Sequence, residues 1–574
     1  LKTDSANVDF VVGYDGTDNV RIAPSNLSSG GASSLNGLSD VSVDLTNDSA
    51  YLINIPSGLS GATGNLIIGE NAGNALTSQD NVIAIGSNAL SANNNSLTEN
   101  AIFIGKDTGK NITANVSNST VIGTYAAENS NDLSNGAVIL GYRALRYGGA
   151  TFSVYIGTNA AANNTSQWGY SSVGIGNSVL LNSVTNSSVV IGQNAQNNGN
   201  ANKTVVLGYE GARTVSSDGH ISVGWRAGYS QTSGAGNTNI GYEAGYTNTT
   251  SGNNTTVGYQ TLKTSTGADN TSLGYQAATA VTTSSRGVYI GSEVALIATT
   301  GVSDSVLIGA DVQKSSAGAS QSVIIGSAAG ESAPGDSVVS IGYNAGKDNT
   351  AFGLVSIGAF AGYSNTSGAA NVNLGYNAGQ NNLTGANRLC IGYQAGRQNT
   401  GGNNTFVGFE AGKGVSGSST GGNNTTLGYQ AGSSLTTGSN NTIIGYDADA
   451  SSATATNEIT LGDANIATLR CQVQTISALS DSRDKTNVQP STYGLDLISQ
   501  LQPVTFDWNM RDGAKVGQKD LGFIAQELQE VDDENLQLVY DNNPDRLEAS
   551  YGRLIPVLVQ AIKELKAEVE LLKA

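Results

Sequence analysis

Ile240-Gly241-Tyr242-Glu243-Ala244-Gly245 is one copy of a short unit that recurs along most of this chain, and Leu427-Gly428-Tyr429-Gln430-Ala431-Gly432 is another. The unit is an apolar residue, a glycine, two variable residues and then usually an alanine, often followed by glycine. Aligned on its central glycine, it occurs 24 times between Gly69 and Gly462, at spacings of 16 to 20 residues and mostly 16 or 17. A short period repeated this often indicates a solenoid, in which each coil buries one face on the next.

The residues of the unit indicate which kind of solenoid it builds. Segments such as Ser188-Val189-Val190-Ile191 are rich in β-branched residues, which favour strands. The recurring glycine permits a sharp bend or a close approach of two backbones. The small alanine fits a narrow interior, and Asn and Thr gather where the coil must turn, as in 252–256. We therefore predict a mainly β fold, a parallel β-roll or β-solenoid of about 24 short coils with two short strands in each.

One segment of the array comes close to a known repeat. Asn81-Val82-Ile83-Ala84-Ile85-Gly86 resembles the Asn-Ser-Val-Ala-Ile-Gly-like unit in the head of trimeric autotransporter adhesins, a left-handed parallel β-roll. This array differs from that head in its longer coil and in its Gly-Tyr-x-Ala-Gly ending. The resemblance implies a homotrimeric shaft.

The composition changes sharply at Ser480. Only five of the 74 glycines lie beyond Leu479, whereas four of the seven prolines do. We expect four regions: a β-rich lead-in or shaft at 1–60, the solenoid array at 61–465, a linker strand at 466–479 suggested by the alternation from Ile466 to Ile476, and a small α+β domain at 480–574.

Charge and residue counts exclude several classes of protein. The net charge of −18 argues against nucleic acid and against anionic membrane as partners, because both need basic patches. The single histidine, His220, and the two cysteines, Cys390 and Cys471, leave no His-rich metal site and no disulfide framework. We expect Cys390 to be a small buried hydrophobe. No apolar run approaches the length of about 18 residues that a membrane span needs, and we expect no cofactor and no metal.

Aromatic residues recur in register with the repeat. Ten copies carry tyrosine directly after the glycine, as at Tyr259 and Tyr376. These rings could pack against a neighbouring subunit, form a ladder on the outside of the coils, or simply line a wet surface. Trp168 and Trp225 could stack on a sugar or be buried for structural reasons. The longer coils between Gly86 and Gly105, Gly157 and Gly176, and Gly408 and Gly428 predict protruding loops.

The last helix shows a separate pattern. Apolar residues recur at alternating spacings of three and four, which is the seam of a coiled coil: Ile555, Leu558, Ile562, Leu565, Val569 and Leu572. Pro556 fits the first turn of such a helix, where its missing N–H costs nothing. The pattern allows a trimer. The alternative is a surface helix whose apolar side packs on its own domain.

Three motifs carry a second resemblance. The Ser480-Asp481-x-Arg483-x-Lys485 start, the Gly-Phe-Ile-Ala-Gln-Glu segment at 522–527 and the Leu-Ile-Pro-x-Leu start of the last helix at 554–558 occur in this order. Together they resemble the intramolecular chaperone domain of phage tail spikes, endosialidases and tail fibres, which are self-cleaving S74 serine peptidases. The resemblance covers about residues 480–574.

Serine and lysine can also be paired from their chemistry alone. A serine hydroxyl is a poor nucleophile until a base removes its proton, and a lysine can act as that base if desolvation or a nearby positive group lowers its pKa. Ser480 and Lys485 are five residues apart, so they can converge only across a turn or within a tertiary fold. The resemblance implies that Ser480 attacks the carbonyl of Leu479, that Lys485 is the general base, and that Asp481 and Arg483 orient the strand.

These observations favour a phage tail fibre. We expect a virion protein that attaches to the host surface, forms a homotrimer, contacts other tail proteins and binds a host glycan or protein, without binding nucleic acid or inserting into a membrane. The resemblance implies cleavage at Leu479–Ser480 after assembly in the host cytoplasm, which leaves 1–479 as the mature fibre. The alternatives are a purely structural fibre or whisker and a depolymerase of surface glycans. An autotransporter adhesin would need a C-terminal membrane anchor, and the chain ends instead in a charged helix.

Overall fold

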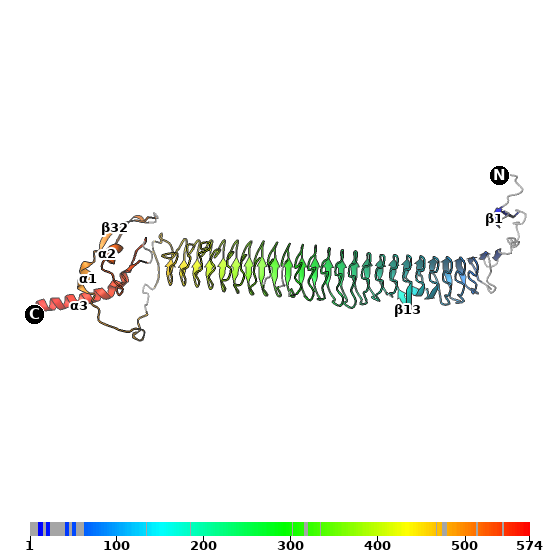
Figure 1. Cartoon of the computed structure of the whole chain (residues 1–574), viewed down its shortest axis with the longest axis horizontal. Helices are drawn as coiled ribbons and strands as arrows, with labels where there is room; N and C mark the ends of the chain where they lie inside the picture. Colours follow the sequence, from blue (N-terminus) through cyan, green and yellow to red (C-terminus); the bar gives the residue numbers. More distant parts are fainter. Residues whose placement is uncertain are drawn as a thin grey trace, which may run out of the picture. The chain divides into compact units, whose positions relative to one another are not determined.

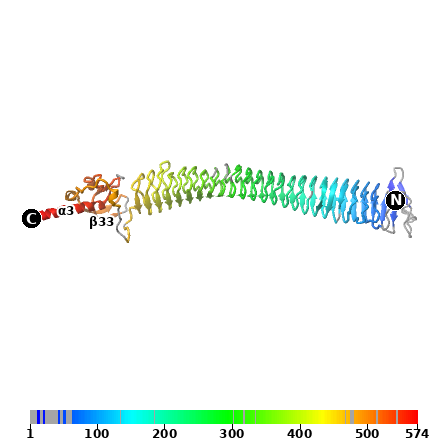
Figure 2. The same cartoon turned by 90° about the horizontal axis from the view of Figure 1, so that it is seen from below.

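The structure is a computed structural model. It describes residues 10–14, 19–22, 41–44, 49–52 and 62–574, except 134, 184, 301, 315–318, 333–334, 467, 473–478, 512–514 and 542–544. The chain forms two units, Leu1–Ser322 and Val323–Ala574, and each is described by itself. In both units the strands of successive coils lie side by side as parallel rungs (Figure 1, and from below in Figure 2).

The first unit begins with two antiparallel strand pairs and continues as a solenoid. The pairs are β1 (Phe10–Tyr14) with β2 (Asn19–Ile22) and β3 (Val41–Asp44) with β4 (Ser49–Leu52), and β4 pairs in parallel with β5 as the first rung. The predicted strands at Val8–Val12 and Tyr51–Ile55 fall partly outside the described residues. The rungs that follow are β5 (Leu66–Ile68), β6 (Asp80–Ile85), β7 (Glu99–Ile104), β8 (Thr120–Ile122), β10 (Val138–Leu140), β12 (Val154–Ile156), β14 (Val173–Ile175), β15 (Val189–Ile191), β16 (Val205–Leu207), β17 (Ile221–Val223), β18 (Thr238–Ile240), β19 (Thr255–Val257), β20 (Thr271–Leu273), β21 (Val288–Ile290) and β22 (Val306–Ile308).

The second unit holds further coils and the C-terminal domain. Its rungs are β23 (Val323–Ile325), β24 (Val339–Ile341), β25 (Val355–Ile357), β26 (Val372–Leu374), β27 (Leu389–Ile391), β28 (Thr405–Val407), β29 (Thr425–Leu427), β30 (Thr442–Ile444) and β31 (Ile459–Leu461). Each glycine predicted to mark a coil directly follows one of these strands in one or the other unit. The predicted mainly β solenoid is therefore confirmed, with its coils where the glycine spacing placed them.

Most coils contain one short strand, where the sequence predicted two. The residue two positions after each repeat glycine often takes a left-handed conformation, as Glu243 does at a φ of 51° and Gln260 at 53°. The chain therefore bends away from the strand at once, and the rest of the coil runs as turns. A second strand per coil forms over one stretch only of the described residues, where β9 (Asn129–Asp132), β11 (Tyr147–Thr151) and β13 (Asn163–Tyr170) make a separate parallel sheet. β13 lies in the long coil predicted to protrude, and its label marks it in Figure 1.

The glycine column is where the coils come closest. Gly258 has a φ of 132° and donates its N–H to the carbonyl of Ile240 in the previous coil at 2.7 Å. A Cβ atom on Gly258 would lie 2.0 Å from the carbonyl oxygen of Gly274 in the next coil. No larger residue fits there, because both the backbone conformation and the contact exclude a side chain. The alanine three positions after the glycine is fully buried, as at Ala244, so the narrow interior is also confirmed.

The tyrosines after the glycines form a ladder on the outside of the coils. In the first unit Tyr209, Trp225, Tyr242, Tyr259 and Tyr275 stack in order, with adjacent ring centroids 4.6 to 6.2 Å apart and ring planes within 12°. A second stack in the other unit runs through Tyr376, Tyr393, Phe409, Tyr429 and Tyr446. Both faces of the Trp225 ring lie against tyrosines, so this ring is packed rather than open to a sugar. The side chain of Trp168 lies outside the described residues.

The linker and the C-terminal domain complete the second unit. The described residues 468–472 form no strand and are exposed, so the alternation between Ile466 and Ile476 finds no sheet to pack on there, and 473–478 lie outside the described residues. The domain contains α1 (Leu495–Gln500), the antiparallel pair β32 (Val504–Asn509) and β33 (Val516–Gly522), α2 (Ala525–Gln529), the antiparallel pair β34 (Val539–Tyr540) and β35 (Glu548–Ala549), and α3 (Leu554–Lys573). This is the predicted small α+β domain ending in a long helix.

We predict that replacing a repeat glycine destabilises the coils severely. Gly258→Ala forces a Cβ into the next coil at a φ that L-residues avoid, so we expect a loss of about 3 kcal/mol or more. Gly219→Ala is the control, because Gly219 has a φ of 78° and open space around its Cβ position, and it should cost only about 1 kcal/mol. Urea unfolding followed by circular dichroism measures both. Equal losses would contradict the role of the glycine column.

His220 gives the solenoid a pH-dependent stability. It occupies the buried position that Asn237, Asn254 and Asn270 take in the next three coils. Its Nδ1 accepts from the backbone N–H of Asn237 at 3.4 Å and from the Gln231 amide at 3.1 Å, while its Nε2 lies 2.9 Å from the Ser217 hydroxyl. These partners suit a neutral ring that carries its proton on Nε2. Burial lowers the pKa of His220 from 6.5 to about 4.

We therefore expect stability to fall as the pH is lowered from about 6.5 to about 4. In that window the unfolded state binds a proton that the folded state refuses, so about 3 kcal/mol of stability present at neutral pH is lost. His220→Asn supplies the side chain used by the neighbouring coils and should remove this part of the pH dependence. Unfolding free energies of both proteins between pH 7 and pH 4 provide the measurement, and identical pH profiles would contradict the assignment.

Candidate functional site

The candidate site lies at the start of the C-terminal domain, where a single tight turn brings Ser480 and Lys485 together. Residues 482–484 form a 3₁₀ turn capped by Asp481, whose side chain accepts from the Arg483 backbone N–H at 2.8 Å. Because of this turn, Lys485 Nζ donates to Ser480 Oγ at 2.5 Å and to the Ser480 carbonyl oxygen at 3.3 Å. The two residues thus converge across a turn, which was one of the two routes open to a pair at this spacing.

Asp481 and Arg483 hold this turn in shape. The Arg483 guanidinium donates to both carboxylate oxygens of Asp481, at 2.6 Å from Nη2 and 3.1 Å from Nε. This pairing lowers the pKa of Asp481 and raises that of Arg483. Their contact is thus with each other and with the backbone of the turn, and it leaves the Lys485 ammonium directed at Ser480.

The segment around this turn is open to solvent. Leu479 is 101% exposed, and Ser480, Asp481, Arg483 and Lys485 are all exposed as well. In this state Lys485 is an ordinary solvated ammonium that donates its proton in a hydrogen bond. A base must instead accept a proton, so chemistry at Ser480 requires that Lys485 be removed from water or placed beside another positive group.

The rest of the domain packs around α3. Leu497, Leu501, Leu528, Leu554 and Val557 belong to its core. The carboxylate of Glu564 in α3 accepts the first N–H of α1, from Leu495, at 2.7 Å, which ties the two helices together and lowers the pKa of Glu564.

The predicted coiled-coil seam of α3 is not used by this core. The helix buries Leu554, Val557 and Ala561 against its own domain. The seam residues lie on another face and are 38 to 86% exposed: Ile555, Leu558, Ile562, Leu565, Val569 and Leu572. The apolar seam is thus distinct from the face by which the helix packs on its domain, and Pro556 lies in the first turn as predicted.

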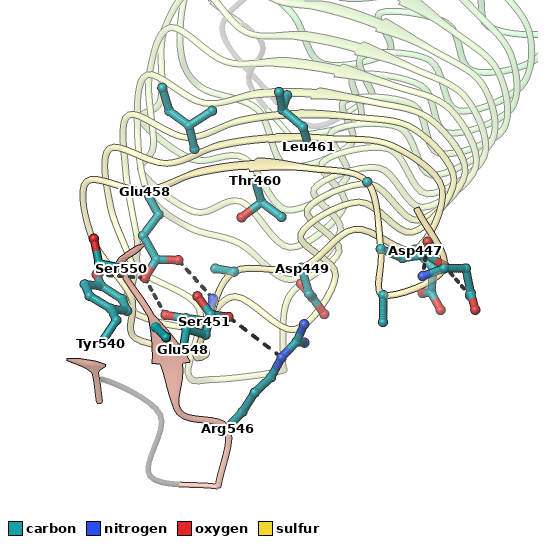
Figure 3. A pocket seen from close by; sticks show the side chains of 17 residues that line it. Asp447, Asp449, Ser451, Glu458, Thr460, Leu461, Tyr540, Arg546, Glu548 and Ser550 are labelled. Carbon is teal, nitrogen blue, oxygen red and sulfur yellow. Dashed lines mark hydrogen bonds and ion pairs between the residues drawn. The ribbon is translucent and has the colours of Figure 1, made fainter. Parts of the chain in front are cut away.

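A polar cavity of about 910 Å³ lies between the last coils and the β34–β35 hairpin (Figure 3). Glu458 accepts from the Ser451 backbone N–H at 2.9 Å and from the Tyr540 hydroxyl at 3.2 Å. Burial raises the pKa of Asp449 in its wall. Sequence reasoning did not single out this cavity, because its lining comes from residues about 90 positions apart, such as Glu458 and Glu548.

Other chemistry is not visible in the described part of the chain. No group of three or more His, Cys, Asp or Glu residues there is placed to hold a metal ion. Cys390 is fully buried, as predicted, and burial raises the pKa of its thiol, while Cys471 is exposed. Among the described helices, none is both long enough and apolar enough to cross a bilayer.

Comparison with known proteins gives the C-terminal region a family. Residues 480–537 match the family model of the S74 peptidases, described as the chaperone of endosialidase. No curated protein matches the chain. The match begins at Ser480, so the serine of the tight turn is the first residue of the matched region. Such domains are typical of phage tail fibre and tail spike proteins with β-solenoids. The chain therefore carries a C-terminal S74 chaperone-of-endosialidase domain after a long β-solenoid.

Proposed function

We propose that this chain is a virion fibre protein of a phage tail whose C-terminal domain directs homotrimer assembly and then cleaves itself from the solenoid at Leu479–Ser480. The observation that supports this most directly is the contact between Lys485 Nζ and Ser480 Oγ at the first residue of the family match. The family is one of homotrimeric assembly, and the exposed seam of α3 suits that role. The released solenoid, 1–479, would attach the virion to the host surface.

The cleavage can be written atom by atom. The Ser480 hydroxyl is three bonds from its own backbone nitrogen, so its attack on the Leu479 carbonyl carbon closes a five-membered ring. Lys485 takes the hydroxyl proton, and the ring collapses by breaking the C–N bond, with the proton passing to the departing Ser480 amine. The product is an ester between the Leu479 carboxyl and Ser480 Oγ. Water then hydrolyses that ester, which restores the serine hydroxyl and leaves Leu479 as a new C-terminus.

The exposure of the site explains why cleavage would wait for assembly. Lys485 is exposed in the single chain, where a lysine side chain stays protonated. Packing of neighbouring copies around the α3 seam would bring protein against this turn and displace water from it. Desolvation disfavours the charged form of a lysine, so the base would form only in the assembled state. A premature cut that left the solenoid unassembled would thereby be avoided.

We predict that wild-type protein yields two fragments that meet at Leu479/Ser480, whereas Ser480→Ala and Lys485→Ala remain intact. Lys485→Arg should also remain intact, because a guanidinium does not give up its proton near neutral pH. Ser482→Ala is the matched control, since Ser482 is an exposed serine in the same turn, and it should be cleaved like wild type. Denaturing gels and mass spectrometry of the purified chains decide the outcome. An intact wild-type chain in a folded trimer would refute self-cleavage.

We also predict that the α3 seam is needed for assembly. Ile562 is 64% exposed and lies on the seam, whereas Leu571 is 82% exposed and lies off it. Ile562→Asp places like charges together at the centre of a coiled coil and should prevent trimer formation, while Leu571→Asp should leave the trimer intact. Light scattering coupled to size-exclusion chromatography of the full chain, in a Ser480→Ala background, gives the mass. Equal behaviour of the two variants would contradict the seam.

Attachment itself is tested on the released fibre. Binding of 1–479 to surface glycans or to whole bacterial cells would support the attachment role. A fibre that assembles and is cleaved but binds neither would be purely structural.

A further inference from the structure

The strands of the solenoid carry their apolar residues on the wrong side for a single chain. We define the strand face as the first and third residues of the last three positions of each rung, as in Thr238 and Ile240 of β18. In every coil the third residue is Ile, Leu or Val, and the first is Val, Ile, Leu or Thr. Yet both columns are half-buried or exposed in each rung, and only the middle residue points inward. Residues that point to solvent are usually the polar ones.

The inward column is less apolar than the outward one. Ser222, Asn239, Ser356, Asn373 and Thr426 occupy middle positions and are at most 1% exposed. Asn239 and Thr256 hydrogen-bond to each other inside the coil at 2.9 Å. Alternation is therefore inverted in these rungs: the interior accepts polar residues, and the strand face accepts none that carries a charge.

Charged side chains are placed elsewhere on the coils. The Glu243–Lys263 pair at 2.7 Å and the Glu410–Lys413 pair at 2.8 Å both involve the position two residues after the repeat glycine, beyond the strand. On the strand face, by contrast, Leu273, Leu374 and Leu427 are 41 to 47% exposed in the single chain. A continuous apolar surface that repeats in coil after coil is larger than a monomeric protein normally leaves open to water.

We propose that the strand face is the surface on which copies of this chain pack against one another, parallel and in register, along the solenoid. This inference rests on the homotrimer of the proposed function and names the surface that would hold it together. A different partner would have to present a matching apolar strip with the same spacings of 16 to 20 residues. A second copy of the chain meets that requirement without further assumption.

The absence of charge also points to identical copies. In a parallel, in-register assembly each residue on the contact face lies near the same residue of the other copies. A charged residue there would meet its own like charge, which is unfavourable in any partly buried setting. A partner of different sequence would instead allow complementary charges, and the strand face offers none in either column.

The test compares two leucines of similar exposure in the second unit. Leu374 ends β26 on the strand face and is 41% exposed, whereas Leu383 lies in a turn of the next coil and is 50% exposed. Leu374→Asp should shift the full chain from trimer to smaller species, or lower its thermal transition, while Leu383→Asp should leave mass and transition unchanged. In a single chain both changes replace a half-exposed leucine in the same way, so only an interface separates them.

A labelling experiment guards against a variant that simply fails to fold. In a Cys471→Ser background, which removes the exposed native thiol, L374C and L383C are treated with a maleimide before and after unfolding. Cys390 is fully buried and stays silent in the folded state. We expect the thiol at 374 to react about a hundredfold more slowly than that at 383 in the folded trimer, and the two to react equally once unfolded.

The outcomes separate this inference from the proposed function. A wild-type chain that is monomeric would overturn both the homotrimer and the strand-face contact. A wild-type trimer in which the thiols at 374 and 383 react equally fast, and in which Leu374→Asp and Leu383→Asp have the same mass and transition, would overturn the strand face alone. Slow labelling at 374 together with loss of the trimer in Leu374→Asp is the expected result.

Discussion

The close contact between the backbones of successive coils at the glycine column is the constraint on which this structure depends. A Cβ at Gly241 would lie 2.1 Å from the carbonyl oxygen of Gly258, and one at Gly258 would lie 2.0 Å from that of Gly274. This contact lets the chain leave each strand by an immediate turn, which keeps the coil short and its interior only a few side chains wide. The interior alanines and the one strand per coil are both consequences of it. A thin coil in turn has little apolar interior, so hydrophobic stabilisation has to be found elsewhere.

The strand face is where this chain has kept that apolar surface. Full burial of one Leu, Ile or Val side chain stabilises a protein by about 1.5–3 kcal/mol, and a half-exposed one contributes only part of that. The middle column cannot make up the difference where it holds Ser, Asn or Thr, as at Ser356 and Asn373. Hydrogen bonds between coils, through the backbone and through the asparagine columns, supply order and register but modest net stability. Association of copies along the strand face would therefore complete a core that a single coil stack leaves half built.

Much of this fold could be predicted from the sequence, because its decisive features are periodic. The glycine spacing placed the strands, and the alanine three residues later predicted the narrow interior. The number of strands per coil could not be predicted, because residues such as Glu243 take left-handed φ values that composition does not reveal. The strand expected between Ile466 and Ile476 failed in residues 468–472 for want of a neighbouring sheet. At the candidate site, the residue types and spacing indicated a Ser480–Lys485 pair, but the 3₁₀ turn capped by Asp481 that joins them depends on three-dimensional geometry.

A repetitive contact surface also explains why such a chain would need a separate assembly domain. Two copies that slip by one coil, 16 or 17 residues, still match Ile or Leu against Ile or Leu along nearly the whole strand face, so that face fixes the register poorly. The irregular coils, such as the one that ends at Gly428 after 20 residues, penalise a slip only where they occur. The α3 seam is short and cannot slip by a coil without losing all its partners, because a slip of about 16 residues nearly exceeds the 20-residue helix. A helix of this kind would set the register once, at the C-terminal end, and the coils could then associate from there. Once every coil is paired, the register is held by the whole strand face, and cleavage at Leu479–Ser480 would remove the domain and with it the route by which the copies could separate and re-pair.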